Sequence, residues 1–175
     1  ESISTALTAV ETAGGGTVYL ANGVHTLAAS LTIASNVTLI GENAEATFID
    51  FNSGSYTINI LGSSAYTTGT VSIDNNSSTL TGSGTTWTGN VTTSDHVLLD
   101  GIWYPVGTVD SNTQITLEIP FGGGDLSGAT YIAAVIKNDV RIERLTLMNS
   151  AVAAITLQYT NEVFMDDLNI IACAT

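Results

Sequence analysis

Two adjacent carboxylates, Asp166 and Asp167, are the residues whose type and spacing most directly allow chemistry. Neighbouring carboxylates can supply a general acid and base for sugar hydrolysis, or can hold Ca²⁺. The alternative is a solvated turn in which Arg144 contacts Asp167 and Arg141 contacts nearby acids. We favour the turn. If this surface is a sugar-binding groove, the candidate catalytic or binding residues are Glu143, Asp166 and Asp167.

The histidines do not add a catalytic pattern. His25 and His96 lie far apart in the sequence, and no Ser or Cys triad pattern accompanies them. We interpret each as a turn or strand residue. The single Cys173 cannot form a disulfide within the chain, and we interpret it as a small apolar residue in a stack of strands.

Two Asp- and Asn-rich segments, Asp74-Asn75-Asn76 and Asp110-Ser111-Asn112, offer oxygen atoms that suit Ca²⁺. The same residue types are favoured in turns because their side chains hydrogen-bond the nearby backbone. We therefore interpret both segments as turns and assign no metal site. Ca²⁺ remains the one cofactor that the sequence leaves open.

Large aromatic residues gather in one stretch: Trp87, Trp103, Tyr104 and Phe121. Aromatic rings can stack on sugars, but a small β domain also needs large side chains for its core. We favour the core. If the rings form a surface instead, Trp87, Trp103 and Tyr104 are the ligand-binding candidates.

Composition narrows the class of partner. Charged residues make up 11% of the 175, hydrophobic ones 44%, and there are 17 glycines, which together indicate an all-β protein. Only three residues are basic against 16 acidic ones, for a net charge of −13. Phosphate groups are bound by clustered Lys and Arg, so nucleic acid and anionic membranes are excluded as partners. No apolar run reaches the roughly 20 residues of a membrane helix.

One helix and several short strands are predicted for residues 1–61. Ile3, Leu7 and Val10 have helical spacing, with Ser2 available as a cap and Gly14 as a stop, which predicts a helix over 2–13. Alternating apolar and polar residues then predict short strands, which are Thr17–Leu20, Val24–Leu27, Leu31–Ile33, Val37–Ile40 and Thr47–Ile49. Strands this short bury their apolar face when successive coils stack as a solenoid, and we expect the helix to cap its end.

An internal repeat joins two segments near the end of the sequence. Residues 138–147 align with residues 161–170 at a shift of 23, and Asn36-Val37-Thr38-Leu39-Ile40 begins in the same way. A period of this length fits a solenoid coil. We therefore expect the coils of 17–61 and those of 137–175 to belong to one solenoid.

The segment between these coils has another pattern. Thr70–Ile73 and Ser78–Thr81 flank an Asn-rich turn, Val97–Leu99 and Trp103–Val106 flank Asp100-Gly101, and Thr113–Leu117 follows. Such turns between alternating strands predict antiparallel hairpins. We expect an inserted antiparallel β-barrel or sandwich over 62–136.

The opening segment resembles a known family. Gly-Gly-Gly-Thr-Val-Tyr-Leu at 14–20 and Leu-Thr-Ile-x-Ser-Asn-Val-Thr-Leu-Ile-Gly-Glu at 31–42 look like the start of the pectate-lyase-like right-handed parallel β-helix. Ala21-Asn22-Gly23 stands where that family usually has Pro-x-Gly. The resemblance implies an all-β fold with an N-terminal capping helix over 1–16. It carries over no catalytic residue, because Arg141 and Arg144 match no catalytic motif of the family.

The inserted segment contains Gly-Thr-Val-Ser-Ile at 69–73, Leu-Thr-Gly-Ser-Gly-Thr-Thr-Trp at 80–87 and Trp-Tyr-Pro-Val at 103–106. With these motifs it resembles a module of phage tail and fibre proteins. The two resemblances imply a structural, receptor-binding part of a phage tailspike or fibre. They imply a homotrimer on the virion surface, with host glycans and other virion proteins as partners. The alternatives are a polysaccharide depolymerase, either lyase or hydrolase, and a bacterial or archaeal surface adhesin or filament subunit. The chain starts at Glu1 and stops at Thr175 within a coil, from which we expect a piece of a longer protein.

Overall fold

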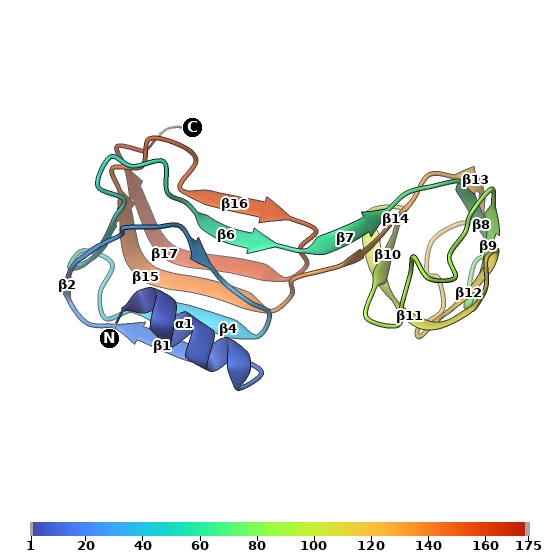
Figure 1. Cartoon of the computed structure of the whole chain (residues 1–175), viewed down its shortest axis with the longest axis horizontal. Coiled ribbons are helices and arrows are strands. Elements are labelled where there is room, and N and C mark those ends of the chain that lie inside the picture. Colours follow the sequence, from blue (N-terminus) through green and yellow to red (C-terminus); the bar gives the residue numbers. More distant parts are fainter. Residues whose placement is uncertain (1, 174–175) are drawn as a thin grey trace. The chain divides into compact units, whose positions relative to one another are not determined.

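The chain forms two compact units in the computed structural model, which describes residues 2–173. The first unit combines Glu1–Leu61 with Lys137–Thr175, and the second is Gly62–Ile136 (Figure 1). The expected stop within a coil at Thr175 lies outside the described residues. No helix among residues 2–173 is long and apolar enough to cross a membrane.

The first unit begins with helix α1 (Ile3–Thr12), as the sequence predicts. The Ser2 side chain accepts a hydrogen bond from the backbone N–H of Thr5 at 3.1 Å, and Gly14 takes the left-handed conformation just beyond the helix. Leu7 is buried and belongs to the core of this unit. The helix therefore covers apolar side chains of the strands that follow it.

Three ladders of parallel strands form the rest of this unit. The first coil of chain contributes β1 (Gly16–Leu20), β2 (Gly23–Thr26) and β3 (Leu31–Thr32), and the second contributes β4 (Val37–Gly41), β5 (Thr47–Asp50) and β6 (Ile58–Leu61). After the second unit the chain returns as β15 (Val140–Met148), β16 (Ile155–Gln158) and β17 (Val163–Ile171). The first ladder has the strand order β1-β4-β15-β17, and all of its pairs are parallel (Figure 1). In the second ladder β2 pairs with β5, and in the third β6 pairs with β3 on one side and β16 on the other.

The internal repeat of 23 residues is confirmed by the strand register. Val140 lies opposite Val163, and the pairing continues to Met148 opposite Ile171. The same strand, β15, also pairs with β4, where Ile142 lies opposite Leu39. The coils before and after the second unit are therefore parts of one parallel sheet.

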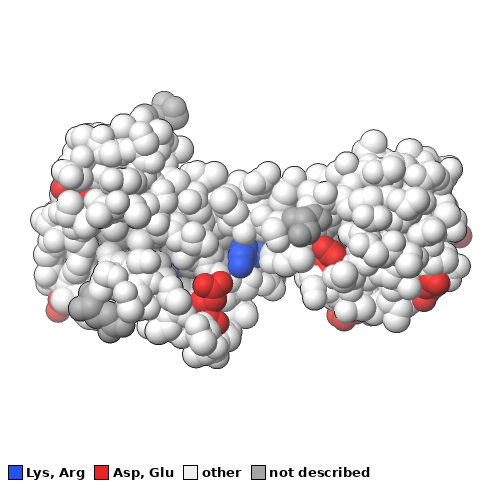
Figure 2. Space-filling view, in the orientation of Figure 1, with Lys and Arg blue, Asp and Glu red and all other residues white. Residues whose placement is uncertain are grey.

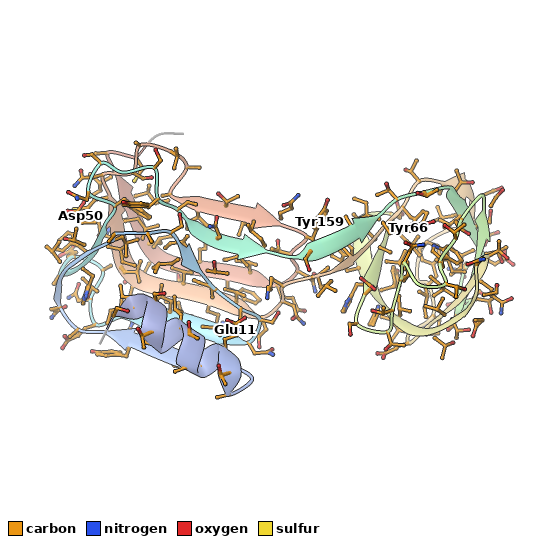
Figure 3. The ribbon with its side chains drawn as sticks, viewed as in Figure 1. Glu11, Asp50, Tyr66 and Tyr159 are labelled. Carbon is orange, nitrogen blue, oxygen red and sulfur yellow. The ribbon has the colours of Figure 1, made fainter. Side chains whose placement is uncertain are left out.

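One core fills the space between the three ladders. It includes Val18, Leu39, Ile49, Ile58, Ile142 and Leu147, which come from all three. Polar side chains form hydrogen bonds at the turns between ladders. Asp50, labelled in Figure 3, accepts hydrogen bonds from the Asn52 backbone N–H at 2.8 Å and from Asn149 Nδ2 at 3.1 Å. Cys173 is half-buried against this core, as expected for a small apolar residue.

The second unit is an antiparallel sheet of eight strands around a core of its own. The predicted hairpins are present: β8 pairs with β9, and β10 pairs with β11 across Asp100 and Gly101. Both of these turn residues have positive φ, as a two-residue hairpin requires. The strands are β7 (Ser63–Tyr66), β8 (Thr70–Ile73), β9 (Thr79–Ser83), β10 (His96–Leu99), β11 (Ile102–Ser111), β12 (Gln114–Leu117), β13 (Leu126–Ala129) and β14 (Ile132–Val135).

Candidate functional site

The outward side of the first parallel ladder brings together side chains that lie far apart in the sequence. Val18, Leu39 and Ile142 point into the core, so the residues that alternate with them point outward. The strand register places these outward residues in two rows. We call the surface they form the ladder face, and it consists of Thr17, Tyr19, Thr38, Ile40, Arg141, Glu143, Phe164 and Asp166.

The first row of the ladder face contains its two carboxylates. Tyr19, Ile40, Glu143 and Asp166 are register partners on β1, β4, β15 and β17 in that order. Because neighbouring strands lie about 4.8 Å apart, the stems of Glu143 and Asp166 stand side by side. Tyr19 is 56% exposed and Asp166 is also exposed, so the row presents an aromatic ring and two acids to solvent.

The second row is organised by Arg141. Thr17, Thr38, Arg141 and Phe164 are register partners. The Arg141 guanidinium lies over the Phe164 ring, 4.5 Å from its centroid, and Phe164 is 45% exposed. Arg141 also forms long ion pairs, at 3.9 Å to Asp139 and 4.0 Å to Glu143. The expected contact of Arg141 with nearby acids is thus confirmed.

Asp167 lies at a bend and not on the ladder face. Arg144 and Asp167 both have positive φ, and the register passes over them between Glu143 and Leu145 and between Asp166 and Leu168. Asp167 is therefore in the turn and Asp166 next to it, as expected. The expected contact between Arg144 and Asp167 is wrong, because no ion pair joins them in residues 2–173. Both side chains leave the turn and are exposed to solvent.

The aromatic candidates of the second unit lie in two environments. Trp87 is fully buried, and its indole N–H donates to the Tyr131 hydroxyl at 2.8 Å, which in turn donates to the Thr68 carbonyl at 2.8 Å. Tyr104 is 3% exposed and packs against the ring of the buried Phe121. The prediction that Trp87 and Tyr104 bind a ligand is therefore wrong, because neither ring has a face that a sugar could reach. Trp103 is half-buried on strand β11.

The two histidines lie in different units, each on a strand. His25 lies on β2, and its Nε2 is 2.9 Å from the Ala21 carbonyl oxygen. His96 lies on β10, and its Nδ1 is buried without a hydrogen-bond partner. Burial lowers the pKa of His96, while Glu118 and Asp95 oppose that effect. Both residues are strand residues, as interpreted from the sequence.

The Asp- and Asn-rich segments use their side chains within turns and strands. The Asp125 carboxylate accepts a hydrogen bond from the Asn75 backbone N–H at 2.7 Å. The Asp110 carboxylate accepts hydrogen bonds from the hydroxyls of Thr108 and Thr116, which lower its pKa. Within residues 2–173, no group of three or more His, Cys, Asp or Glu side chains could hold a metal ion.

Sequence reasoning named the acids of the ladder face and Arg141 but missed its other members. Phe164 could have been found from the repeat, because a shift of 23 residues places it beside Arg141. Thr38 and Ile40 could also have been found, because the segment Asn36–Ile40 begins like the repeat and so aligns them with Arg141 and Glu143. Tyr19 could not, because the repeat does not reach β1. Figure 2 shows one face of the molecule, on which most of the surface is uncharged and acidic groups are scattered.

No protein-family model matches this chain, and no curated protein matches it. Solved structures do match. They include the tailspike gp61 of Pseudomonas phage phi297, with a TM-score of 0.56, 14% identity, 95% of this chain covered and 31% of that one. The tailspike gp49 from Pseudomonas phage LKA1 matches with a TM-score of 0.50 and 16% identity over 95% of this chain and 31% of that one.

A third match is the Gp54 tailspike of Acinetobacter baumannii bacteriophage AP22, solved in complex with A. baumannii capsular saccharide. Its TM-score is 0.50 and its identity 15%, over 98% of this chain and 34% of that one. The chain thus spans about a third of the length of these tailspikes. At such identities the likeness concerns the fold, and this chain has a tailspike-like, strand-rich fold.

Proposed function

We propose that this chain is part of a phage tailspike or fibre and that its ladder face binds glycans of the bacterial surface. The observation that carries the proposal is the strand register, which puts Phe164, Tyr19, Glu143, Asp166 and two threonine hydroxyls on one face of the sheet. Sugars are bound by this combination, because aromatic rings pack on their C–H faces and carboxylates accept hydrogen bonds from their hydroxyl groups. The capsular saccharide bound to the AP22 tailspike supports the same ligand class.

The architecture proposed for this role is a right-handed parallel β-helix on the virion surface, as a homotrimer in contact with other virion proteins. The exposed apolar side chains of β17 support a parallel β-helix with further coils. Leu147 on β15 is fully buried, whereas its register partner Ile170 on β17 is 56% exposed. Ile142 and its partner Met165 differ in the same way, at 0% and 40%. A further parallel strand paired with β17 would bury Ile170 and Met165, just as the neighbouring strands bury Leu147 and Ile142 on β15. A rigid trimer would also raise avidity for a repetitive polysaccharide.

The test is binding of the purified chain to an immobilised array of bacterial capsular and O-antigen saccharides. We expect Phe164→Ala to weaken binding about tenfold, as expected for loss of one aromatic contact at a binding surface. Glu143→Gln should weaken it to a similar extent, through loss of a charged acceptor. The matched control is Ile119→Ala, which truncates an equally exposed apolar residue of the second unit. Absence of binding to every saccharide, or equal loss in the control, would reject the proposal.

A second candidate function is a polysaccharide depolymerase, and the register of Glu143 with Asp166 favours it. Retaining glycosidases hold two carboxyl groups roughly 5 Å apart, which is close to the spacing of neighbouring strands. The assay is the release of new reducing ends or unsaturated products from capsular and pectic polysaccharides, with and without Ca²⁺. Cleavage that is lost in Asp166→Asn would establish the enzyme. Binding without cleavage would leave glycan recognition as the function.

A further inference from the structure

The outward side of the third ladder carries no charge. Leu31 on β3 and Ile58 on β6 are buried in the core, so the residues that alternate with them point outward. The register places Thr32, Asn59 and Thr156 in one row across β3, β6 and β16. We call the surface on this side the uncharged face, and it consists of Ser30, Thr32, Thr57, Asn59, Thr156 and Gln158.

The absence of charge extends along the chain beyond these residues. The segments that pass through the third ladder contain no Asp, Glu, Lys or Arg, and they are residues 27–41, 51–61 and 146–161. Lys137 lies at the margin, opposite Thr160 beyond the end of β16. The other ladders differ, since the first carries Arg141 and Glu143 on its outward side and the second carries Asp50. One side of the solenoid is thus uncharged over three coils, in a chain whose net charge is −13.

Charge decides which surfaces of two copies of this chain can meet. Copies with a net charge of −13 repel each other, and burying a carboxylate without a partner is costly. Two ladder faces brought together would place Glu143 and Asp166 against the acids of the second copy. Hydroxyl and amide groups both donate and accept hydrogen bonds, so the uncharged face can pair with an identical face. Hydroxyls already pair between its coils, where Thr57 Oγ1 lies 3.2 Å from Thr156 Oγ1.

We propose that the uncharged face is the surface through which copies of this chain pack against one another. The inference goes beyond glycan binding, because it names the surface on which the proposed homotrimer forms. The ladder face belongs to a different ladder, so this packing leaves it open to a ligand. Three short strands make a small face, and we therefore expect weak association that grows with the concentration of the chain.

The first measurement is sedimentation velocity of the purified chain at concentrations from about 10 μM to about 1 mM. It is made at about 10 mM and about 150 mM NaCl, between which the Debye length falls from about 30 Å to about 8 Å. We expect association to strengthen at the higher salt concentration, because screening reduces the repulsion between copies and leaves an uncharged contact intact. Association that weakens with salt would indicate a contact made of ion pairs and would overturn the inference.

The second measurement uses charged variants of exposed threonines. Thr32→Asp should weaken association at least about tenfold, because each copy would bury an unpaired carboxylate. Thr26→Asp is the matched control, with the same change at an exposed residue of β2 in the second ladder. Circular dichroism melting shows whether both variants fold.

Cross-linking covers the case in which Thr32→Asp does not fold. In a Cys173→Ser chain, a short bismaleimide should link copies that carry Asn59→Cys and should not link copies that carry Thr26→Cys. Equal cross-linking in the two variants would overturn the inference.

The remaining outcomes separate this surface from others. Ile170→Asp places a charge among the exposed apolar side chains of β17. Association that is lost in Ile170→Asp and kept in Thr32→Asp would place the contact on β17 and overturn the inference, as would a chain that is monomeric under every condition. Saccharide binding reports separately on the proposed function. Loss of association in Thr32→Asp with saccharide binding retained supports both proposals, whereas association through this face without any saccharide binding would reject the proposed function alone.

Discussion

The guanidinium of Arg141 lies 4.5 Å from the centroid of the Phe164 ring, and the two residues are register partners on β15 and β17. An exposed cation–π contact of this kind contributes about 0.5–1 kcal/mol. The contact fixes the one cation of the ladder face over an aromatic ring, beside the acid Glu143.

We therefore expect Phe164→Leu to lower the free energy of unfolding by about 0.5–1 kcal/mol, because the cation–π contact is lost while apolar contact remains. Urea denaturation followed by circular dichroism measures this change. The control is Tyr19→Leu, which removes an exposed ring of the same face. An equal loss of stability in both variants would contradict a specific role for the Arg141 contact.

The N-terminal helix gives a second prediction. Leu7 is 4% exposed in the core, so Leu7→Asp should place an unpaired charge there and cost more than about 3 kcal/mol. Thermal unfolding and size-exclusion chromatography should show loss of folding or aggregation. Thr8→Asp places the same charge on the exposed side of the helix. If Leu7→Asp melts like the Thr8 variant, the helix does not cap the core.

Gly41, the last residue of β4, gives a third prediction. A Cβ atom at this position would overlap the backbone carbonyl oxygen of Arg144 on the next coil. Gly41→Ala should therefore separate β4 from β15 and destabilise the first unit by at least about 1–3 kcal/mol. Gly124→Ala, with open space around the new Cβ, is the control. Guanidinium denaturation curves compare the two, and a Gly41 variant as stable as the control would refute the close approach.

Much of this arrangement could be predicted from the sequence, because alternation and turn residues are local signals. The helix and the short strands between Thr17 and Ile49 were predicted within one or two residues at either end. The Asp100-Gly101 hairpin was also predicted, but its second strand, β11, runs to Ser111, five residues beyond the predicted end at Val106. The pairing of β15 with β4 was expected only as membership of one solenoid. Its register was not predicted, because it depends on packing between Ile142 and Leu39, which are 103 residues apart.

The candidate site was harder to predict than the fold. The acids were visible as residue types, but whether an aromatic residue is core or surface depends on tertiary packing. Trp87 follows polar threonines and is fully buried, whereas Trp103 stands in an apolar segment and is only half-buried on β11. The contact of Arg144 with Asp167 failed as a prediction: both residues occupy left-handed turn positions and are exposed, and no ion pair joins them among residues 2–173.

His96 gives a prediction for acidic pH. Burial lowers its pKa in the folded chain below the ordinary value of 6.5. The unfolded chain therefore binds a proton more readily, and the second unit should lose stability as the pH falls through and below about 6.5. Tryptophan fluorescence reports on this unit, since both tryptophans lie in it. His96→Gln should flatten the dependence of this unit's stability on pH between pH 7 and pH 5, whereas His25→Gln should leave that dependence unchanged. If His96→Gln does not flatten it, His96 is not its cause.

Tyr131 gives the opposite dependence at alkaline pH. Burial raises its pKa to about 12, so stability is full below the ordinary value of 10.0 and is lost as the pH rises towards 12. Tyr131→Phe should remove this alkaline loss. It should also cost about 1–3 kcal/mol at neutral pH, because the Trp87 N–H and the Thr68 carbonyl lose their partner. Tyr19→Phe, on an exposed ring, should change neither quantity in urea titrations at pH 7 and pH 11.

The pairing of β7 with β14 affects how the chain folds. Ser63 and Val135, near the two ends of the inserted unit, are register partners. Once that unit has folded, the two chain ends that leave it are held as neighbours, and the 102 residues between Leu39 and Ile142 act as a much shorter loop. The entropy of closing the parallel sheet then falls, and its contacts become effectively local. We therefore expect the inserted unit to fold first and the β4–β15 pairing to form after it.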